Sequence, residues 1–239
     1  MPNKKYGQYC SIALALEVLG DRWTLLVLRE LLCGSRRFND LRRGVPKMSA
    51  TLLTTRLRTL EDAGVIERVE IDGRPNYRPS LAGLELLPIL EGLGVWGRRW
   101  VRHLDDDDLD ISLLMWEMRR RVDIEAIPRA EMVLFLHFQD APQGKRSFWI
   151  RVRKGEAELC MQAPGGDIDL ALRCDVRTFT EVWTGDLTIV QARKTGALRM
   201  EGAPDLLKTF GDWIGLNPFS VVELPQALHA EGKAAVKAS

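Results

Sequence analysis

The stretch from residue 49 to residue 68 carries the clearest hydrophobic pattern of the chain. Leu53, Leu57 and Leu60 recur at helical spacing and make one apolar stripe. Ser49 precedes this stripe, and its hydroxyl can accept a hydrogen bond from a backbone N–H left unpaired in the first helical turn. The pattern therefore predicts an amphipathic helix that begins directly after Ser49.

The opposite face of this helix is hydroxylated and basic. Because each residue turns a helix by about 100°, Thr51, Thr55 and Arg58 lie nearly opposite the leucine stripe. Short hydroxyl side chains and arginine can meet base edges and phosphates in a major groove. The same periodicity is also typical of an ordinary surface helix, so the neighbouring segments must decide between the two interpretations.

Three helices are predicted upstream of this one. Residues 12–20 form a one-stripe helix that ends at a glycine, and Asp21 opens a second helix over residues 22–34. The second is apolar nearly all round, so we expect it to be the most buried. A short basic helix at residues 36–43 is followed by a turn at residues 44–47. Two helices joined by a tight turn, the second with an open polar face, match the helix-turn-helix plan.

A β-hairpin is predicted directly after the helix. Residues 65–71 and 77–81 read as two strands, and turn-forming residues join them. Beside a helix-turn-helix such a hairpin is a wing, in which Arg68, Arg74 and Arg78 can reach phosphates. Arg74, at the tip, is the candidate for a narrow minor groove. A plain surface hairpin is the alternative.

The segment from residue 80 to residue 104 predicts a long helix, which Pro88 can kink. Its apolar positions share one face: Leu86, Leu90, Leu93, Gly97, Trp100 and Leu104. Trp96 adds a large apolar side chain, and the glycines allow another backbone to approach closely. This face can pack against its own domain or against a second copy of the chain, and the periodicity leaves both open.

A second domain is expected after the acidic run at residues 105–110, which marks a boundary. A helix is expected at residues 109–121, strands at 132–138, 147–155, 157–163, 169–175 and 198–202, and further helices at 176–185 and 204–215. Strands followed by helices on one face indicate an α+β fold. We therefore expect domains at residues 1–104 and 109–225, and a mobile tail at 226–239.

Charge is distributed unevenly along the 239 residues. The net charge is +1, but residues 1–100 hold 16 Lys and Arg against 11 Asp and Glu, and the remainder holds 18 against 22. A basic first half and an acidic second half suit one domain that touches a polyanion and one that does not. No signal peptide or membrane-spanning run is visible, so a cytoplasmic location without membrane contact is expected.

The motifs of common enzyme classes are missing from the sequence. It contains no nucleophile elbow, Walker loop, dinucleotide fingerprint or H-E-x-x-H pair, and its three histidines lie far apart. Its four cysteines have neither close pairing nor zinc spacing. We therefore expect no enzyme activity, no cofactor and no metal.

Cys10 has two interpretations. It directly precedes a predicted helix, with Lys4 and Lys5 nearby, and a helix dipole and a cation both lower the pKa of a thiol. A reactive thiolate would make Cys10 a redox sensor. A free cysteine is otherwise a small buried apolar residue, which is the expectation for Cys33, Cys160 and Cys174.

Several spaced motifs together carry a family resemblance. The segments GDRWTLLVLREL, RRFNDL, SATLLTTRLRTL and AGVIER occur in order and resemble the winged-helix HxlR-type bacterial transcriptional regulators, over about residues 8–103. Ser11 stands where proline is common, and Gly-Asp-Arg replaces the commoner Gly-Gly-Lys, but neither departure touches the DNA-facing positions.

This resemblance implies a homodimer that binds double-stranded DNA at a pseudo-palindromic operator, paired through its N-terminal segment and the helix at residues 80–104. It also implies a redox role for Cys10 in some members. The predicted DNA contacts are Arg37, Lys47, Ser49, Thr51, Thr55, Arg56, Arg58, Arg68, Arg74 and Arg78.

The second half is similar to sterol-carrier-protein domains, over about residues 128–222. The resemblance lies in the segment from Asp175 to Phe210, which contains FTEVWTGDLTIVQARKTGALRMEG. It implies an apolar tunnel for a lipid or another hydrophobic molecule. The candidate lining is Phe179, Val182, Trp183, Leu187, Ile189, Leu207, Phe210 and Trp213, each of which could equally belong to a closed core.

These observations favour a dimeric DNA-binding regulator, more naturally a repressor, whose second domain binds a hydrophobic small-molecule effector. Two alternatives stay open. The chain could be a hydrophobic-ligand or lipid carrier, or a regulator switched by the thiol of Cys10.

Overall fold

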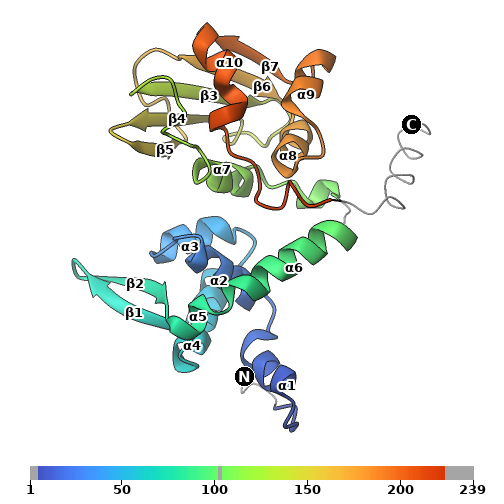
Figure 1. The fold of residues 1–239 in the computed structure, drawn as a ribbon. Coiled ribbons are helices and arrows are strands. Elements are labelled where there is room, and N and C mark those ends of the chain that lie inside the picture. The colour runs from blue at the N-terminus through green and yellow to red at the C-terminus, as the bar shows by residue number, and fades with distance from the viewer. Residues whose placement is uncertain (1–4, 102–103, 224–239) are drawn as a thin grey trace. The chain divides into compact units, whose positions relative to one another are not determined.

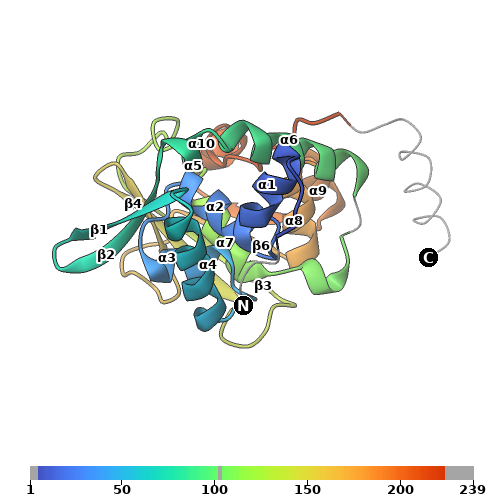
Figure 2. The same cartoon turned by 90° about the horizontal axis from the view of Figure 1, so that it is seen from below.

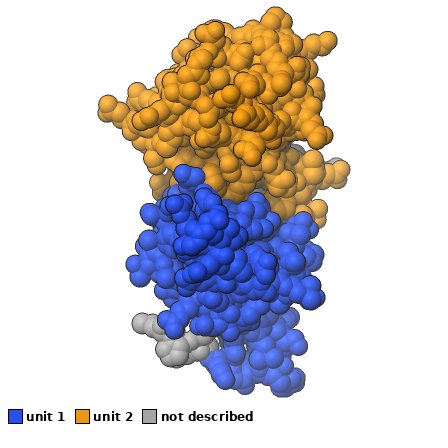
Figure 3. All heavy atoms as spheres, turned by 90° about the vertical axis from the view of Figure 1, so that its left-hand side faces the viewer, with its two compact units in different colours: residues 1–94 blue, residues 95–239 orange. Residues whose placement is uncertain are grey.

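The computed structural model describes residues 5–101 and 104–223, so the expected tail at 226–239 lies outside the described residues. The chain divides into two compact units, residues 1–94 and residues 95–239, shown in two colours in Figure 3.

The first unit consists of helices and one hairpin (Figure 1). In order these are α1 (Ser11–Leu19), α2 (Thr24–Leu32), α3 (Phe38–Gly44), α4 (Ala50–Asp62), β1 (Ile66–Ile71), β2 (Arg74–Pro79), α5 (Leu81–Leu84) and the first part of α6 (Leu87–Trp100). Its core gathers buried side chains from α2, α3, α4 and β1, including Val27, Leu28, Leu31, Leu41, Leu53, Leu57, Leu60 and Ile66.

Helix α2 differs from expectation at its start and on one face. It begins at Thr24 rather than at residue 22, because Trp23 precedes it in a left-handed conformation with φ of 80°. The helix is heavily buried, as expected, but not all round: the Leu26 side chain is 41% exposed. The charged residue Glu30, by contrast, is buried within this helix.

The predicted long helix after the hairpin is two helices. α5 ends at Leu84 and α6 begins at Leu87, so the break falls just before Pro88. Pro88 has no backbone N–H to donate to the carbonyl of Leu84, four residues earlier, so a continuous helix would lack a hydrogen bond where α5 ends. α6 ends at Trp100, and residues 102 and 103 lie outside the described residues.

The second unit is a five-stranded sheet with helices. Its elements are α7 (Ile111–Arg119), β3 (Met132–Phe138), β4 (Ser147–Arg153), β5 (Glu156–Cys160), β6 (Leu170–Cys174), α8 (Val176–Thr184), α9 (Ile189–Thr195), β7 (Arg199–Gly202) and α10 (Pro204–Trp213). A short 3-10 turn, Asp106–Asp108, precedes α7. The strand order is β5-β4-β3-β6-β7. β3 and β6 run parallel, and the other neighbours run antiparallel. This is the mixed α+β arrangement that the sequence predicts.

One face of this sheet forms the core of the unit. The alternate residues Met132, Leu134, Leu136 and Phe138 of β3 are buried in one cluster with side chains of α7, α8 and α10. The intervening residues of β3 are only half-buried and do not belong to that cluster. The sheet therefore has one face under helices and one face that points away from the core.

Candidate nucleic-acid interface

Helix α4 is positioned by its cap and its leucine stripe. Ser49 is the N-cap residue, and its Oγ accepts a hydrogen bond from the backbone N–H of Leu52 at 3.2 Å. Leu53, Leu57 and Leu60 are buried in the core of the first unit, as their spacing predicts. The sequence therefore fixes both the start of the helix and the face that it turns inward.

The opposite face of α4 is exposed. Thr51, Thr55 and Arg58 all lie on the surface. The hydroxyl of Thr55 donates to the carbonyl of Thr51 at 3.0 Å, and Thr54, also exposed, donates to Ala50 at 3.0 Å. Arg58 has only a long contact of 3.8 Å with Asp62, and such exposed pairs contribute little. This face therefore offers short polar side chains and one extended cation.

Arg56 lies elsewhere. Its Nη1 is 2.8 Å from Oδ2 of Asp21, its Nε donates to the backbone carbonyl of Arg22 at 3.1 Å, and its side chain is only 15% exposed. The residue braces α4 against the loop before α2. It does not share the outward face with Thr51 and Arg58.

The buried carboxylate of Glu30 supports the turn between α3 and α4, and the sequence did not predict this role. Glu30 is fully buried and accepts hydrogen bonds from Arg29 at 3.0 Å and Ser35 at 3.2 Å. Arg29 also donates to the carbonyl of Gly44 at 2.8 Å. A Cβ at Gly44 would overlap the carboxylate of Glu30. The sequence feature that could have indicated this support is Glu30 inside the otherwise mostly apolar helix α2, together with Gly44 at the end of α3.

Two predicted cations flank this turn. Arg37 is the exposed N-cap residue of α3, and Lys47 is exposed just before α4. They lie on the segments that lead into the helix with the polar face.

The hairpin β1–β2 extends beyond the helices of its unit in both views (Figures 1 and 2). Its turn is shorter than predicted, because only Asp72 and Gly73 lie between the strands, with φ of 52° and 67°. Positive φ at both positions is typical of the tight turns that match strand twist. Arg74 is the first residue of β2, so it stands next to the tip.

The predicted wing arginines are all exposed. Arg78 pairs with Glu67 on the opposite strand at 2.7 Å, whereas neither Arg68 nor Arg74 has an ion-pair partner among the described residues. The base of the hairpin is fixed, since the backbone N–H of Tyr77 donates to the carbonyl of Arg36 at 2.8 Å. The wing therefore presents two unpaired cations from an anchored base.

Large apolar side chains are exposed on α1, on α6 and on the residues next to these helices. The exposed set comprises Tyr6, Tyr9, Ile12, Leu14, Leu16, Leu87, Ile89, Leu93, Trp96, Trp100 and Val101. No residue of α6 is buried, and Trp96 is 57% exposed. Groups of exposed large apolar side chains on one helix are typical of interaction sites.

The expectation of a buried thiol is confirmed for Cys174 and wrong for Cys33. Cys10 and Cys33 are exposed, Cys160 is half-buried and Cys174 is buried. Cys10 is the N-cap residue of α1, and the backbone N–H groups of Ala13 and Ile12 lower the pKa of its thiol. Burial raises the pKa of the Cys160 and Cys174 thiols. Cys10 is therefore the exposed thiol whose surroundings favour the thiolate.

The eight predicted ligand-lining residues come together in the second unit. Phe179, Val182 and Trp183 on α8 and Phe210 and Trp213 on α10 are buried in its core. Leu187, Ile189 and Leu207 are partly buried against that core. The indole Nε1 of Trp213 is buried and has no hydrogen-bond partner among the described residues.

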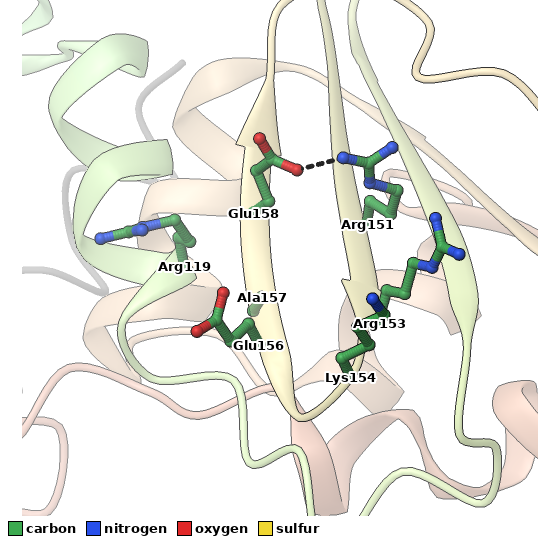
Figure 4. A pocket seen from close by; sticks show the side chains of 7 residues that line it. All are labelled: Arg119, Arg151, Arg153, Lys154, Glu156, Ala157 and Glu158. Carbon is green, nitrogen blue, oxygen red and sulfur yellow. Dashed lines mark hydrogen bonds and ion pairs between the residues drawn. The ribbon is translucent and has the colours of Figure 1, made fainter.

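Two hollows occur elsewhere on this unit, and neither includes any of these eight residues. The first, of about 360 Å³, lies beside β4 and β5 and is lined by Arg119, Arg151, Arg153, Lys154, Glu156, Ala157 and Glu158 (Figure 4). Figure 4 shows Arg151 pointing to Glu158, with which it pairs. The second, of about 510 Å³, is lined by residues 124–125, 127–131 and 154–155.

Helices α2–α4 with the hairpin define a winged helix-turn-helix protein. A family model described as HxlR-like helix-turn-helix matches residues 18–105. An HTH-type transcriptional regulator of Synechocystis is 37% identical over 119 residues, covering 48% of this chain and 86% of the relative. A regulator of Methanothermobacter thermautotrophicus is 35% identical over 100 residues, covering 41% and 76%. The solved structure of the HTH-type regulator YtcD matches with 35% identity and a TM-score of 0.35, covering 37% of this chain and 93% of that one.

The chain belongs to the HxlR-like helix-turn-helix family of DNA-binding transcriptional regulators. The matched relatives are HTH-type transcriptional regulators. Each alignment covers less than half of this chain, so the family is established through the first unit. Among the described residues, no helix is long and apolar enough to cross a membrane.

Proposed function

We propose that this regulator binds an operator as a dimer, with α4 in the major groove and the hairpin on the adjacent minor groove. The observation that carries the proposal is the exposed face of Thr51, Thr55 and Arg58, opposite a buried leucine stripe. Arg74 beside the wing tip supplies a second contact, and Arg37 and Lys47 approach phosphates. Ser49 caps the recognition helix, and Arg56 positions it.

We assign the pairing of two copies to α1 and α6. Both helices carry apolar side chains that stay exposed in a single chain, and burying them on a second copy would remove this surface from water. A two-fold pair of winged helices fits an operator with two related half-sites. The sign of regulation that fits best is repression, because a dimer seated on DNA competes with other proteins there.

The DNA assignment is tested with an operator selected from random duplexes. Fluorescence anisotropy over a salt series should show affinity falling steeply as salt rises, because phosphate contacts release counterions. Arg74→Ala should weaken binding to all sequences and reduce the salt slope by about 1. Thr55→Val should instead change the base preference at one position in each half-site.

Lys208→Ala is the matched control, because Lys208 is an exposed cation on α10 of the second unit. It should leave affinity and salt slope unchanged. If neither Arg74→Ala nor Thr55→Val alters binding more than Lys208→Ala does, the assigned face is wrong.

We further infer that the second unit is a sterol-carrier-like domain that binds a hydrophobic effector between α8 and α10. The support is that Phe179, Trp183 and Phe210 belong to the same core as Trp213, whose buried Nε1 has no hydrogen-bond partner among the described residues. A buried donor without a partner costs about 1–3 kcal/mol, which a ligand oxygen would recover. Because these residues are closely packed, the ligand would enter by opening the core.

We infer that the effector signal would pass from α8 to α6 within the second unit. Arg98, in the last turn of α6, makes two hydrogen bonds to Asp186, which follows α8. α6 also contributes its first turns to the first unit. A ligand that displaces α8 can therefore act on the helix that we assign to dimerisation, provided that it binds the two arrangements with different affinity.

Native mass spectrometry of the purified chain tests the effector proposal. A co-purifying apolar molecule that changes operator affinity when added back supports it. A molecule that binds tightly and leaves operator affinity unchanged supports the alternative of a hydrophobic-ligand carrier. Trp213→Phe should weaken binding of an oxygen-bearing ligand without changing binding of a pure hydrocarbon.

A thiol switch at Cys10 is the second candidate for regulation. The favouring observation is its exposure at the start of α1, where backbone N–H groups stabilise the thiolate. Operator affinity should then respond to hydrogen peroxide in the native chain and in Cys33→Ser, which removes the other exposed thiol, but not in Cys10→Ser. An unchanged response in Cys10→Ser removes this candidate.

A further inference from the structure

The outward face of the five-stranded sheet carries an aromatic platform. Phe135 on β3 and Trp149 on β4 are directly opposite each other, with ring centroids 5.2 Å apart and ring planes inclined by 37°. The His137 ring lies 6.1 Å from Phe135, and its Nδ1 is 3.1 Å from Oγ of Ser147. These side chains are half-buried and lie outside the hydrophobic core. Their outer surfaces remain available for stacking.

Two exposed arginines that form no ion pair among the described residues stand beside this platform. Arg173 on β6 and Arg199 on β7 are directly opposite each other, and both are exposed. Like charges in such positions destabilise a sheet. Neither guanidinium has a hydrogen bond or an ion pair within the described part of the chain, and the Arg173 guanidinium carbon lies 5.9 Å from the Phe135 ring centroid. Local conflicts of this kind are expected at functional sites.

We propose that this face binds a small aromatic monocarboxylate. The ring stacks on Phe135 and Trp149, and the carboxylate accepts hydrogen bonds from Arg173 and Arg199. Guanidinium groups stay charged and match carboxylate geometry. An aromatic ring on the platform and a carboxylate on the arginines are therefore recognised by adjacent parts of the same face.

The local charge selects a monoanion. On the outward face of β6 and β7, Arg173 and Arg199 contribute two positive charges, and Glu201, opposite Ala171, contributes one negative charge. The other arginines of this face are already neutralised, since Arg151 pairs with Glu158 and Arg153 with Glu131. A nucleic-acid strand needs a row of uncompensated cations. One net positive charge fits a single carboxylate better.

The test uses the full chain without DNA, so its outcome is independent of operator binding and of the apolar ligand proposed for the core. Calorimetry and ligand-observed NMR compare benzoate with cyclohexanecarboxylate, which lacks the aromatic ring, and benzyl alcohol, which lacks the charge. Benzoate should bind at least about threefold more tightly than cyclohexanecarboxylate, because only benzoate can stack. It should bind at least about tenfold more tightly than benzyl alcohol, because only benzoate carries the charge.

Substitutions locate the site. Arg173→Gln with Arg199→Gln should weaken benzoate binding about tenfold or more, and Phe135→Leu should remove the preference for the aromatic ring. Arg153→Gln is the control. It also removes one positive charge from this sheet, but Arg153 is already paired with Glu131, so benzoate binding should be unchanged.

Four outcomes would overturn the proposal. These are absence of benzoate binding at millimolar concentration, equal affinity for cyclohexanecarboxylate, an undiminished affinity in the arginine variant, and an equal loss in Arg153→Gln. Tight binding of a ten-residue thymidine oligonucleotide that depends on both arginines would assign the face to single-stranded nucleic acid instead. Thermal unfolding of each variant confirms that a loss of binding is not a loss of fold.

Discussion

Gly44→Ala tests the buried support under the turn that leads to the recognition helix. In an open helix this change would be favourable, but here the new Cβ would overlap the carboxylate of Glu30. Moving that carboxylate breaks its hydrogen bonds to Arg29 and Ser35. Each is a bond to a charged group in a buried setting, at about 1.5 kcal/mol or more, so we expect a loss of about 3 kcal/mol in unfolding free energy. That is a large part of the stability of an ordinary domain.

Urea unfolding followed by circular dichroism measures this loss. Gly92→Ala is the control, because a Cβ at Gly92 on α6 meets open space and should be neutral or slightly stabilising. In a Glu30→Ala background the obstruction is absent, so Gly44→Ala should cost about 1 kcal/mol or less, which gives a coupling of about 2 kcal/mol. An unchanged cost in that background, or no loss in the single variant, would refute the reasoning.

Three further predictions concern other parts of the chain. Ser49→Ala should lower the unfolding free energy by about 1 kcal/mol, because the N–H of Leu52 loses its acceptor, and should weaken operator binding more than unfolding alone explains. Trp96→Asp should convert the proposed dimer to monomers in analytical ultracentrifugation, with an unchanged circular dichroism spectrum. A hydrogen bond from Arg129 holds the pKa of Asp205 below its ordinary value, so Asp205 stabilises the second unit above about pH 4 and loses that effect as pH falls further. Acid unfolding of Asp205→Asn should show a smaller loss of stability over that range, and an unchanged acid profile would contradict this.

The sequence predicts the secondary structure well where one residue pattern decides it. The apolar segment at residues 132–138 predicted the strand β3, and the leucine stripe predicted the inward face of α4. The prediction from sequence was wrong where the backbone conformation of a single residue sets the end of an element. At Trp23 a positive φ makes α2 begin later than predicted. The prediction also overestimated the length of the wing turn, because two residues with positive φ suffice there.

The candidate site was predictable in part for the same reasons. The position of Arg56 could have been anticipated, since it lies about 140° around the helix from Thr51. Its partners, Asp21 and the carbonyl of Arg22, could not, because they come from a loop more than thirty residues away. The pairing of Glu30 with Ser35 and the approach of Gly44 are likewise tertiary facts.

The hydroxyl of Thr55 donates its one proton to the backbone carbonyl of Thr51 in the same helix. A base edge that meets this side chain finds only lone pairs and a methyl group. Amino groups of adenine and cytosine can satisfy those lone pairs, and the thymine methyl can pack on the methyl group, whereas guanine offers only acceptors in the major groove. The recognition helix should therefore discriminate most strongly against guanine at this step of each half-site.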